Sequence, residues 1–572
     1  MKLFHNVKGS ASGLAFVALV SVSSGFLEAT PAFAKAPEQA QPAILTASAI
    51  AVADKYSADA AEQIFKEGGN AVDAAVAIAF TLAVTYPEAG NIGGGGFMTL
   101  YVDGKPYFLD YRERAPLAAT KNMYLDDKGE VIKGMSVIGY RSVGVPGTVD
   151  GMWQAQRRFG KLKWKQVLAP AIHYARDGFE VSQQLQQRRD DAAKDFAGKT
   201  NFDTYFGNLK QGVNFKQADL AAVLQRISDQ GAQDFYSGRT ADLIAASMRG
   251  HGLITKDDLQ QYKAVWREPV QANWNGYRVI TAPPPSSGGV GLVQLLKMKA
   301  DIAPEFKDVP PNSAQYVHLI AEIEKRVFAD RAQYLGDPGF VKVPVGRLID
   351  PAYSARRAAQ IDPVHPSPTA SVAPGLEKPQ TTHFSIVDRW GNAVSNTYTL
   401  NGWFGSGVIV EGAGFALNDE MDDFSAKPNT PNSTGVVGGD ANAIAPGKRP
   451  LSSMTPTILT RNGTVAMVIG TPGASRIFTS VFQVLADVYD FHMPLARAEK
   501  QFRFHHQLLP EDVVFSEPWA PCPPSLVKAL EARGYAVQDQ GWNGDIEAIQ
   551  ILGRTPAPSA DPRGRGRALI IR

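Results

Sequence analysis

The residues with the clearest potential for chemistry stand where a strand is expected to begin, at Thr381-Thr382. The 20 residues before them, 361–380, include five prolines and indicate a flexible linker. If the peptide bond after Gln380 is cut, Thr381 becomes an N-terminal residue. Its α-amine, with a pKa of about 7.7–8.0, can then take the proton from its own hydroxyl. The pattern predicts a threonine nucleophile; the alternative is that two β-branched residues simply open a strand.

A β-hairpin is expected to position this threonine. Residues 382–387 are β-branched and aromatic, residues 388–392 are typical of a turn, and residues 393–400 alternate again. If the turn centres on Trp390, Thr381 lies opposite Thr399. The same face then carries His383, Ser385 and Thr397. A bulge at Gly391 would shift this register by one residue.

Upstream of the linker, helical segments alternate with short Gly- and Pro-rich segments from residue 48 to about residue 360. This organisation, without an internal repeat, predicts one large mixed domain. The spacing of apolar residues predicts helices over residues 48–68, 70–84, 164–177, 290–300 and 313–335. Asn70 is the expected cap of the second helix. The run from Gly93 to Gly96 lacks phosphate-loop spacing and predicts close backbone packing.

The composition is that of an ordinary globular protein. Of 572 residues, 44% are hydrophobic and 20% are charged, and the formal net charge is +2. This balance, without a basic run interleaved with aromatic residues, argues against nucleic acid as a partner. Cys522 is the only cysteine, which excludes an intrachain disulfide, a cysteine-based zinc site and an iron–sulfur cluster.

Residues 1–34 have the features of a secretory signal peptide. Lys2 and Lys8 precede an apolar stretch from Leu14 to Phe26, and Ala32-Phe33-Ala34 matches a cleavage site. A membrane anchor is the alternative, but the stretch has 13 residues where a span needs about 20. Export without cysteine pairs fits a bacterial periplasm, and no membrane contact is expected once the signal is removed.

Several ordered motifs resemble the signatures of the γ-glutamyltransferase family. In the C-terminal third they are residues 380–385 (QTTHFS), 418–424 (NDEMDDF), 450–454 (PLSSM) and 470–476 (GTPGASR). Other segments are similar to the same family, namely residues 69–75, 91–97, 111–113, 145–147 and 503–507. The resemblance runs from about residue 48 to residue 563, and this many motifs in family order make it specific.

The resemblance implies an α/β (α+β) fold, the four-layered αββα sandwich of the N-terminal-nucleophile hydrolases. It also implies a precursor that cuts itself between Gln380 and Thr381. The large chain would comprise residues 35–380 and the small catalytic chain residues 381–572. The two chains would stay associated as a heterodimer.

The same resemblance assigns roles to individual residues. Thr381 is the nucleophile that takes the γ-glutamyl group as an ester, and Thr399 orients it. Arg112 would clamp the substrate α-carboxylate. The hydroxyls of Ser452 and Ser453 would help it, and the α-amino group would be held by Asn401, Glu420 and Asp423. One fixed cation with acidic groups suits an amino-acid zwitterion.

The family's oxyanion hole corresponds to the backbone N–H groups of Gly473 and Ala474, where this chain departs from a common Gly-Gly pair. Alanine preserves the donor if its φ is negative, whereas a positive φ would cost stability or misdirect the N–H. A second departure is Thr434, within a stretch, 427–442, that has the length of the family's active-site lid. Many Gram-negative members have a tyrosine there, so the balance between transfer and hydrolysis stays open.

No cofactor or metal ion is expected. The acidic run 419–423 lacks the spacing and glycine of an EF-hand loop. His505 and His506 are adjacent and lack the context of a zinc site, which favours a structural role.

The function that the resemblance implies is that of a periplasmic, self-processing γ-glutamyl transferase and hydrolase. Glutathione is the expected donor, and amino acids, dipeptides or water are the expected acceptors. Two alternatives are a cephalosporin (glutaryl) acylase on the same fold and an inactive periplasmic protein that binds peptides.

Overall fold

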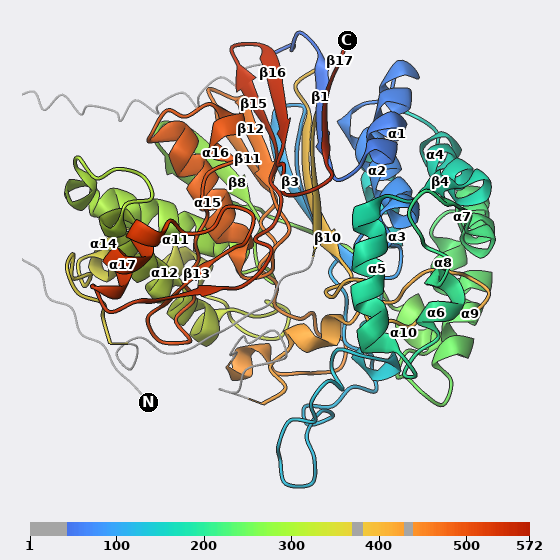
Figure 1. Cartoon of the computed structure of the whole chain (residues 1–572). Coiled ribbons are helices and arrows are strands. Elements are labelled where there is room, and N and C mark those ends of the chain that lie inside the picture. The colour runs from blue at the N-terminus through green and yellow to red at the C-terminus, as the bar shows by residue number, and fades with distance from the viewer. Residues whose placement is uncertain (1–42, 369–380, 428–438) are drawn as a thin grey trace, which may run out of the picture. The chain divides into compact units, whose positions relative to one another are not determined.

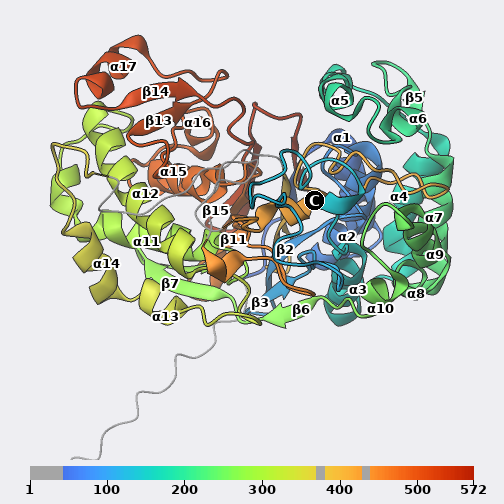
Figure 2. The same cartoon turned by 90° about the horizontal axis from the view of Figure 1, so that it is seen from below.

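The computed structural model of the protein describes residues 43–368, 381–427 and 439–572, which lie in one compact unit. Two antiparallel sheets face each other, and helices cover the outer face of each (Figure 1). The view from below shows the two helical layers on opposite sides of the sheets (Figure 2). The expected four-layered αββα sandwich is confirmed.

The first sheet has seven strands, and the hairpin that follows Thr381 lies near its middle. In spatial order they are β17 (Arg567–Ile571), β1 (Ser48–Val52), β9 (Thr382–Val387), β10 (Ala393–Thr399), β2 (Gly95–Val102), β3 (Lys105–Asp110) and β6 (Val265–Arg267). The second sheet has six strands, in the order β16 (Thr555–Ala560), β15 (Glu547–Leu552), β12 (Thr464–Gly470), β11 (Thr457–Arg461), β8 (Tyr277–Thr281) and β7 (Val270–Trp274).

Each sheet takes strands from both sides of residue 381. Strands β9, β10 and β17 pair with strands from the N-terminal part in the first sheet, and β11 pairs with β8 in the second. The apolar layer between the sheets likewise mixes both parts, with Ala49, Tyr101, Ile280, Val387, Ile458, Val468 and Ile549 among its buried members. A cut before Thr381 would therefore leave two chains joined by hydrogen-bonded ladders and a shared core.

The helices form the two outer layers. On the first sheet lie α1 (Lys55–Lys66), α2 (Ala71–Thr85), α3 (Thr148–Phe159) and, behind them, α4 (Trp164–Asp177). On the second sheet lie α11 (Gly288–Asp301) and α15 (Arg476–Tyr489), and α12 (Ala314–Tyr334) packs on α11. The remaining helices are α5 (Gln183–Phe196), α6 (Phe202–Phe206), α7 (Ala218–Gln230), α8 (Gln233–Ser237), α9 (Arg239–Met248), α10 (Lys256–Gln260), α13 (Val345–Leu348), α14 (Pro351–Ala358), α16 (Leu495–Ala498) and α17 (Pro524–Glu531). Two small sheets pair β4 (Phe179–Glu180) with β5 (Asn214–Phe215) and β13 (Val513–Ser516) with β14 (Ala536–Asp539).

Four of the five expected helices form within one or two residues of the expected bounds. Asn70 caps α2, and its side chain accepts from the N–H groups of Val72 and Asp73 in a capping box. The helix expected over residues 48–68 is wrong at its start, because Ser48–Val52 is strand β1 and the helix begins only after Asp54. This short apolar run is buried between β17 and β9, and periodicity alone does not separate a buried strand from a buried helix.

The hairpin register is as predicted, without a shift at Gly391. Val387 pairs with Ala393, Ser385 with Ser395, and Thr382 with Tyr398. The next position in this register sets Thr381 opposite Thr399.

Some predictions concern segments outside the described residues. These segments are the signal peptide (1–34), the last 12 residues of the linker with Gln380, and Thr434. Among the helices that the structure does describe, none is both long and apolar enough to cross a bilayer.

Candidate active site

One pocket at the open end of the hairpin brings together the residues proposed from the sequence. Its lining contains Arg112, Thr381, Thr399, Asn401, Glu420, Asp423, Ser452, Ser453, Met454, Ala474 and Ile477. Every described residue with a predicted role is in this set except Gly473, which directly precedes Ala474. Segments as distant in sequence as residues 112 and 474 therefore meet around Thr381.

The glycine run fixes the position of Thr399. A Cβ on Gly94 would lie 2.1 Å from the carbonyl oxygen of Thr399, so only glycine permits this approach. Asn91 donates to the same oxygen at 2.8 Å. The expected close backbone packing of Gly93 to Gly96 is confirmed, and it holds the end of β10 beside the pocket.

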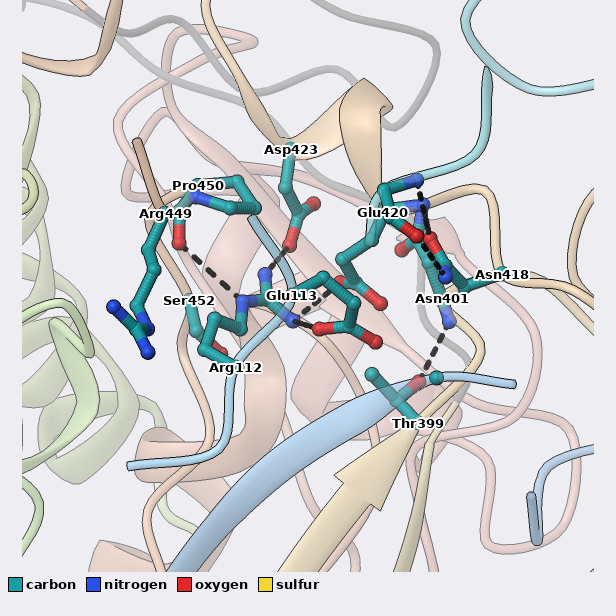
Figure 3. A network of polar contacts seen from close by, with 12 residues as sticks. Arg112, Glu113, Thr399, Asn401, Asn418, Glu420, Asp423, Arg449, Pro450 and Ser452 are labelled. Atoms are coloured by element: carbon teal, nitrogen blue, oxygen red, sulfur yellow. Dashed lines mark hydrogen bonds and ion pairs between the residues drawn. The ribbon is translucent and has the colours of Figure 1, made fainter. Parts of the chain in front are cut away.

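The chain turns sharply after Thr399. The hydroxyl oxygen of Thr399 accepts from the N–H of Asn401 at 2.8 Å (Figure 3). Asn401 has a φ of +73°, which asparagine tolerates better than most residues. Its side-chain amide donates to the carbonyl oxygen of Asp419 at 3.1 Å, which joins the hairpin end to the acidic segment.

A buried histidine connects β9, the strand that follows Thr381, to its neighbours. His383 contacts the hydroxyls of Thr397 at 2.7 Å and Ser385 at 3.1 Å, and Ser385 donates to the carbonyl of Glu547 in the second sheet. Burial lowers the pKa of His383 to about 3, so the ring is neutral near pH 7. A Cβ on Gly470 would clash with this ring, so glycine makes room for it. His383 stiffens the strand that begins next to Thr381.

Arg112 is the electrostatic centre of the pocket. Its guanidinium donates to Glu420 and to Asp423, and its side chain is 1% exposed (Figure 3). It also donates to the backbone carbonyls of Pro450 at 3.3 Å and Leu451 at 3.2 Å. The residues assigned to opposite ends of a zwitterion thus contact each other, and one ligand can engage both signs of charge.

Glu113 is a third carboxylate of this cluster, and no role was assigned to it from the sequence. One of its oxygens lies 3.6 Å from the guanidinium of Arg112. Burial raises the pKa of Glu113 to about 7, against the lowering effect of Arg112. Burial also raises the pKa of Glu420 well above its usual range. An ammonium group of a ligand would oppose both shifts, because a nearby positive charge favours the ionised form of a carboxyl group.

Ser452 and Ser453 line the same pocket and directly follow Pro450 and Leu451, whose carbonyls accept from Arg112. Arg331, buried on α12, donates to the hydroxyls of Ser287 at 3.0 Å and Ser453 at 3.3 Å. This second cation was also missed from the sequence, because nothing in its helical context separates it from a surface arginine. It adds positive potential on the serine side, where a ligand carboxylate would lie.

The two residues expected to supply the oxyanion donors, Gly473 and Ala474, lie in the turn before α15. Gly473 has a φ of +137° and Ala474 a φ of +48°, so the alanine lies in the left-handed region. The sequence left the sign of this φ open, and the structure gives the strained alternative. The turn leads into the N-terminus of α15, whose dipole favours negative charge nearby.

Within the described residues, no group of three or more histidine, cysteine, aspartate or glutamate side chains is arranged to hold a metal ion. His505 contacts Thr479 and Gln507, and His506 contacts the carbonyl of Val513 at 2.7 Å. Both histidines are buried away from the pocket.

The family model for gamma-glutamyltranspeptidase matches residues 57–571. The chain belongs to the gamma-glutamyltranspeptidase family. It is 61% identical over 543 residues to the glutathione hydrolase proenzyme of Pseudomonas aeruginosa, covering 95% of this chain and 98% of that protein. It is therefore related over nearly its full length to an enzyme made as a precursor.

Two solved structures are similar to this chain. A chain of the gamma-glutamyltranspeptidase of Pseudomonas nitroreducens complexed with L-DON is 61% identical, with a TM-score of 0.56, covering 56% of this chain and 96% of that one. The cephalosporin acylase of Bacillus halodurans is 26% identical, with a TM-score of 0.78, covering 94% and 98%. The fold is thus shared with an acylase.

Ala474→Gly is expected to stabilise this protein. The left-handed conformation costs alanine about 1 kcal/mol relative to glycine, so the melting temperature should rise by roughly 1 °C. Ala355→Gly, in the exposed part of α14, is the matched control and should lower it. Calorimetry of both variants checks the prediction, and a lower melting temperature for Ala474→Gly would contradict it.

Glu113 is expected to make ligand binding depend on pH. Because its pKa is raised to about 7, the carboxylate is largely protonated at pH 6 and ionised at pH 8. L-glutamate, which carries an ammonium group, should bind roughly threefold to tenfold more tightly at pH 8. Glu113→Gln should flatten this change, as measured by titration calorimetry. An equal pH dependence in the variant would show that another group is responsible.

Proposed function

We propose that this protein is a self-processing γ-glutamyl transferase and hydrolase that acts on glutathione and related γ-glutamyl compounds. The observation that carries the proposal is the position of Thr381, at the head of β9 in the same pocket as Arg112 and its carboxylates. The name of the Pseudomonas aeruginosa relative supports glutathione as donor. Family membership and a threonine at this position argue against the alternative of an inactive periplasmic protein that binds peptides.

Maturation would begin with the hydroxyl of Thr381 attacking the carbonyl carbon of Gln380. The C–N bond breaks as the acyl group moves to oxygen, and the nitrogen takes up the hydroxyl proton to become the free amine. Water then hydrolyses the ester, which releases the carboxylate of Gln380 and returns the hydroxyl of Thr381. The products would be a large chain, 35–380, and a small chain, 381–572.

Catalysis would use the new N-terminus as its base. The α-amine of Thr381 takes the hydroxyl proton as the oxygen attacks the γ-carbonyl carbon of the donor. The N–H groups of Gly473 and Ala474 would stabilise the resulting oxyanion, aided by the N-terminus of α15. The leaving amine takes the proton, and an acceptor amine or water then resolves the γ-glutamyl ester. Thr399 would orient Thr381 throughout.

Donor recognition would depend on the charges around Arg112. The α-carboxylate would lie between Arg112 and the hydroxyls of Ser452 and Ser453, with Arg331 behind. The α-ammonium would face Asn401, Glu420 and Asp423, which line the same pocket. Because Glu420 and Asp423 already contact Arg112, the ligand would share these carboxylates with the arginine rather than find them separate.

A glutaryl or cephalosporin acylase is the second candidate, and the similarity to the Bacillus halodurans structure favours it. The carboxylate cluster favours the first candidate, because a glutaryl group brings no ammonium and would leave these charges unmatched.

Residues 1–34 support export, with the periplasm as the proposed location.

Thr381→Ala should leave a single uncut chain, because the attacking hydroxyl is gone, whereas wild type should give two bands on a denaturing gel. Thr381→Ser should be cut more slowly, since a hydroxyl remains. Thr382→Val, whose side chain lies on the other face of the strand, is the control and should be cut normally. N-terminal sequencing of the smaller band must begin at Thr381. Uncut but active wild-type protein would refute the mechanism.

Asp423→Asn should lower the rate with γ-glutamyl anilides at least about tenfold, because a charge-assisted hydrogen bond in a partly buried site is worth about 1.5–3 kcal/mol. Activity on glutaryl anilides should change much less, and self-cleavage should be normal. Comparing kcat/KM for the two substrates in wild type and variant is the measurement. Equal losses on both substrates would favour the acylase.

A further inference from the structure

The acidic segment that contacts Arg112 is a single 3-10 turn, η4 (Glu420–Asp423), with two faces. Glu420 and Asp423 line the pocket, and their carboxylates accept from Arg112. Met421 and Asp422 point the other way and are buried, each 1% exposed. The positions of the two pocket carboxylates therefore depend on what supports the opposite face of the turn.

That support is the segment 115–139, here called the excursion, seen as the blue loop that projects at the bottom of Figure 1. It begins two residues after Glu113 and returns to the body at Gly139. Ala115 donates to the carbonyl of Lys448 at 2.7 Å, and Gly139 donates to that of Ser406 at 2.9 Å. Both of its ends are thus hydrogen-bonded to segments from the C-terminal part of the chain.

The contact between the excursion and η4 is buried. Ala115, Ala119 and Tyr124 form an apolar cluster with Met421, Phe424 and Ile444, and Met123 and Met135 pack against it. Within this apolar contact the hydroxyl of Ser136 donates to the carboxylate of Asp422. Ser136 is 6% exposed, so this charge-assisted hydrogen bond is shielded from water.

Two ion pairs also join the excursion to the chain beyond η4, and they are weaker. Lys427 pairs with Glu130 at 3.0 Å, and Lys121 pairs with Asp440 at 2.9 Å. Their side chains are between 35% and 75% exposed, so salt screens these pairs and each contributes little. The C-terminal end of η4 is held separately, because Asn442 donates to the carbonyl of Asp423 at 2.7 Å. The Ser136–Asp422 contact, in contrast, is a buried polar contact on the far face of η4.

We infer that the excursion is a specificity-determining element, in which Ser136 and Asp422 are positioning residues for Glu420 and Asp423. Through this support it sets the affinity of the pocket for the α-ammonium of the donor. The inference rests on the proposed function. It predicts that removing the hydroxyl of Ser136 weakens the binding of ligands with an ammonium group. The binding of ligands without an ammonium group should stay nearly unchanged.

The test is Ser136→Ala, with two matched variants. Ser136→Thr keeps the hydroxyl and should restore wild-type behaviour. Ser354→Ala removes the same kind of contact elsewhere, since Ser354 donates to Asp301 at 2.6 Å on the far side of the second helical layer. Titration calorimetry measures binding of L-glutamate and of glutarate, and kinetics compare γ-glutamyl and glutaryl anilides.

Ser136→Ala should weaken L-glutamate binding and raise KM for the γ-glutamyl anilide roughly fivefold to tenfold, with kcat and glutarate binding nearly unchanged. Equal effects on the ligands with and without an ammonium group, or an equal effect of Ser354→Ala, would overturn the inference. So would normal L-glutamate binding by Ser136→Ala. Wild-type cleavage of the γ-glutamyl anilide tests the proposed function by itself. An active wild type with an unaffected Ser136→Ala variant would refute only the positioning role.

Discussion

Arg112 places a permanent positive charge where water has almost no access, and such a charge persists in a folded protein only when it is paired. Its partners come from the adjacent Glu113, from η4 about 310 residues later, and from the carbonyls of Pro450 and Leu451. The pairing requirement thus joins three segments around one guanidinium. The pocket is the space that these segments leave beside the hairpin.

The hairpin supplies the other half of the site, and its rigidity has a separate origin. β9 and β10 lie near the middle of the seven-stranded sheet, so both edges of the hairpin are hydrogen-bonded and its faces are covered. His383 and Ser385 connect it to the second sheet. A central strand that is hydrogen-bonded on both sides restrains the residue directly before it, Thr381, and such restraint suits the proposed nucleophile.

Local patterns predicted much of this arrangement. The hairpin register followed from the turn and the alternation of side chains, and Asn70 followed from capping chemistry, because each depends on residues close in sequence. The strand at Ser48–Val52 was mistaken for helix because its identity depends on β17 and β9, which are distant in the chain. Glu113 and Arg331 gave no local signal, since burial and partners alone distinguish them from ordinary charged residues.

The sequence by itself determined the identity of the chemical groups and the family to which they belong. It named the threonine that could act as its own base, its hairpin partner, and the arginine, serines and carboxylates of the pocket. Only the tertiary structure decided how their charges meet: that Glu420 and Asp423 contact Arg112, that Glu113 joins them, and that Ala474 adopts a φ of +48°. The reason is that desolvation and backbone strain arise from packing between distant segments, which no local pattern encodes.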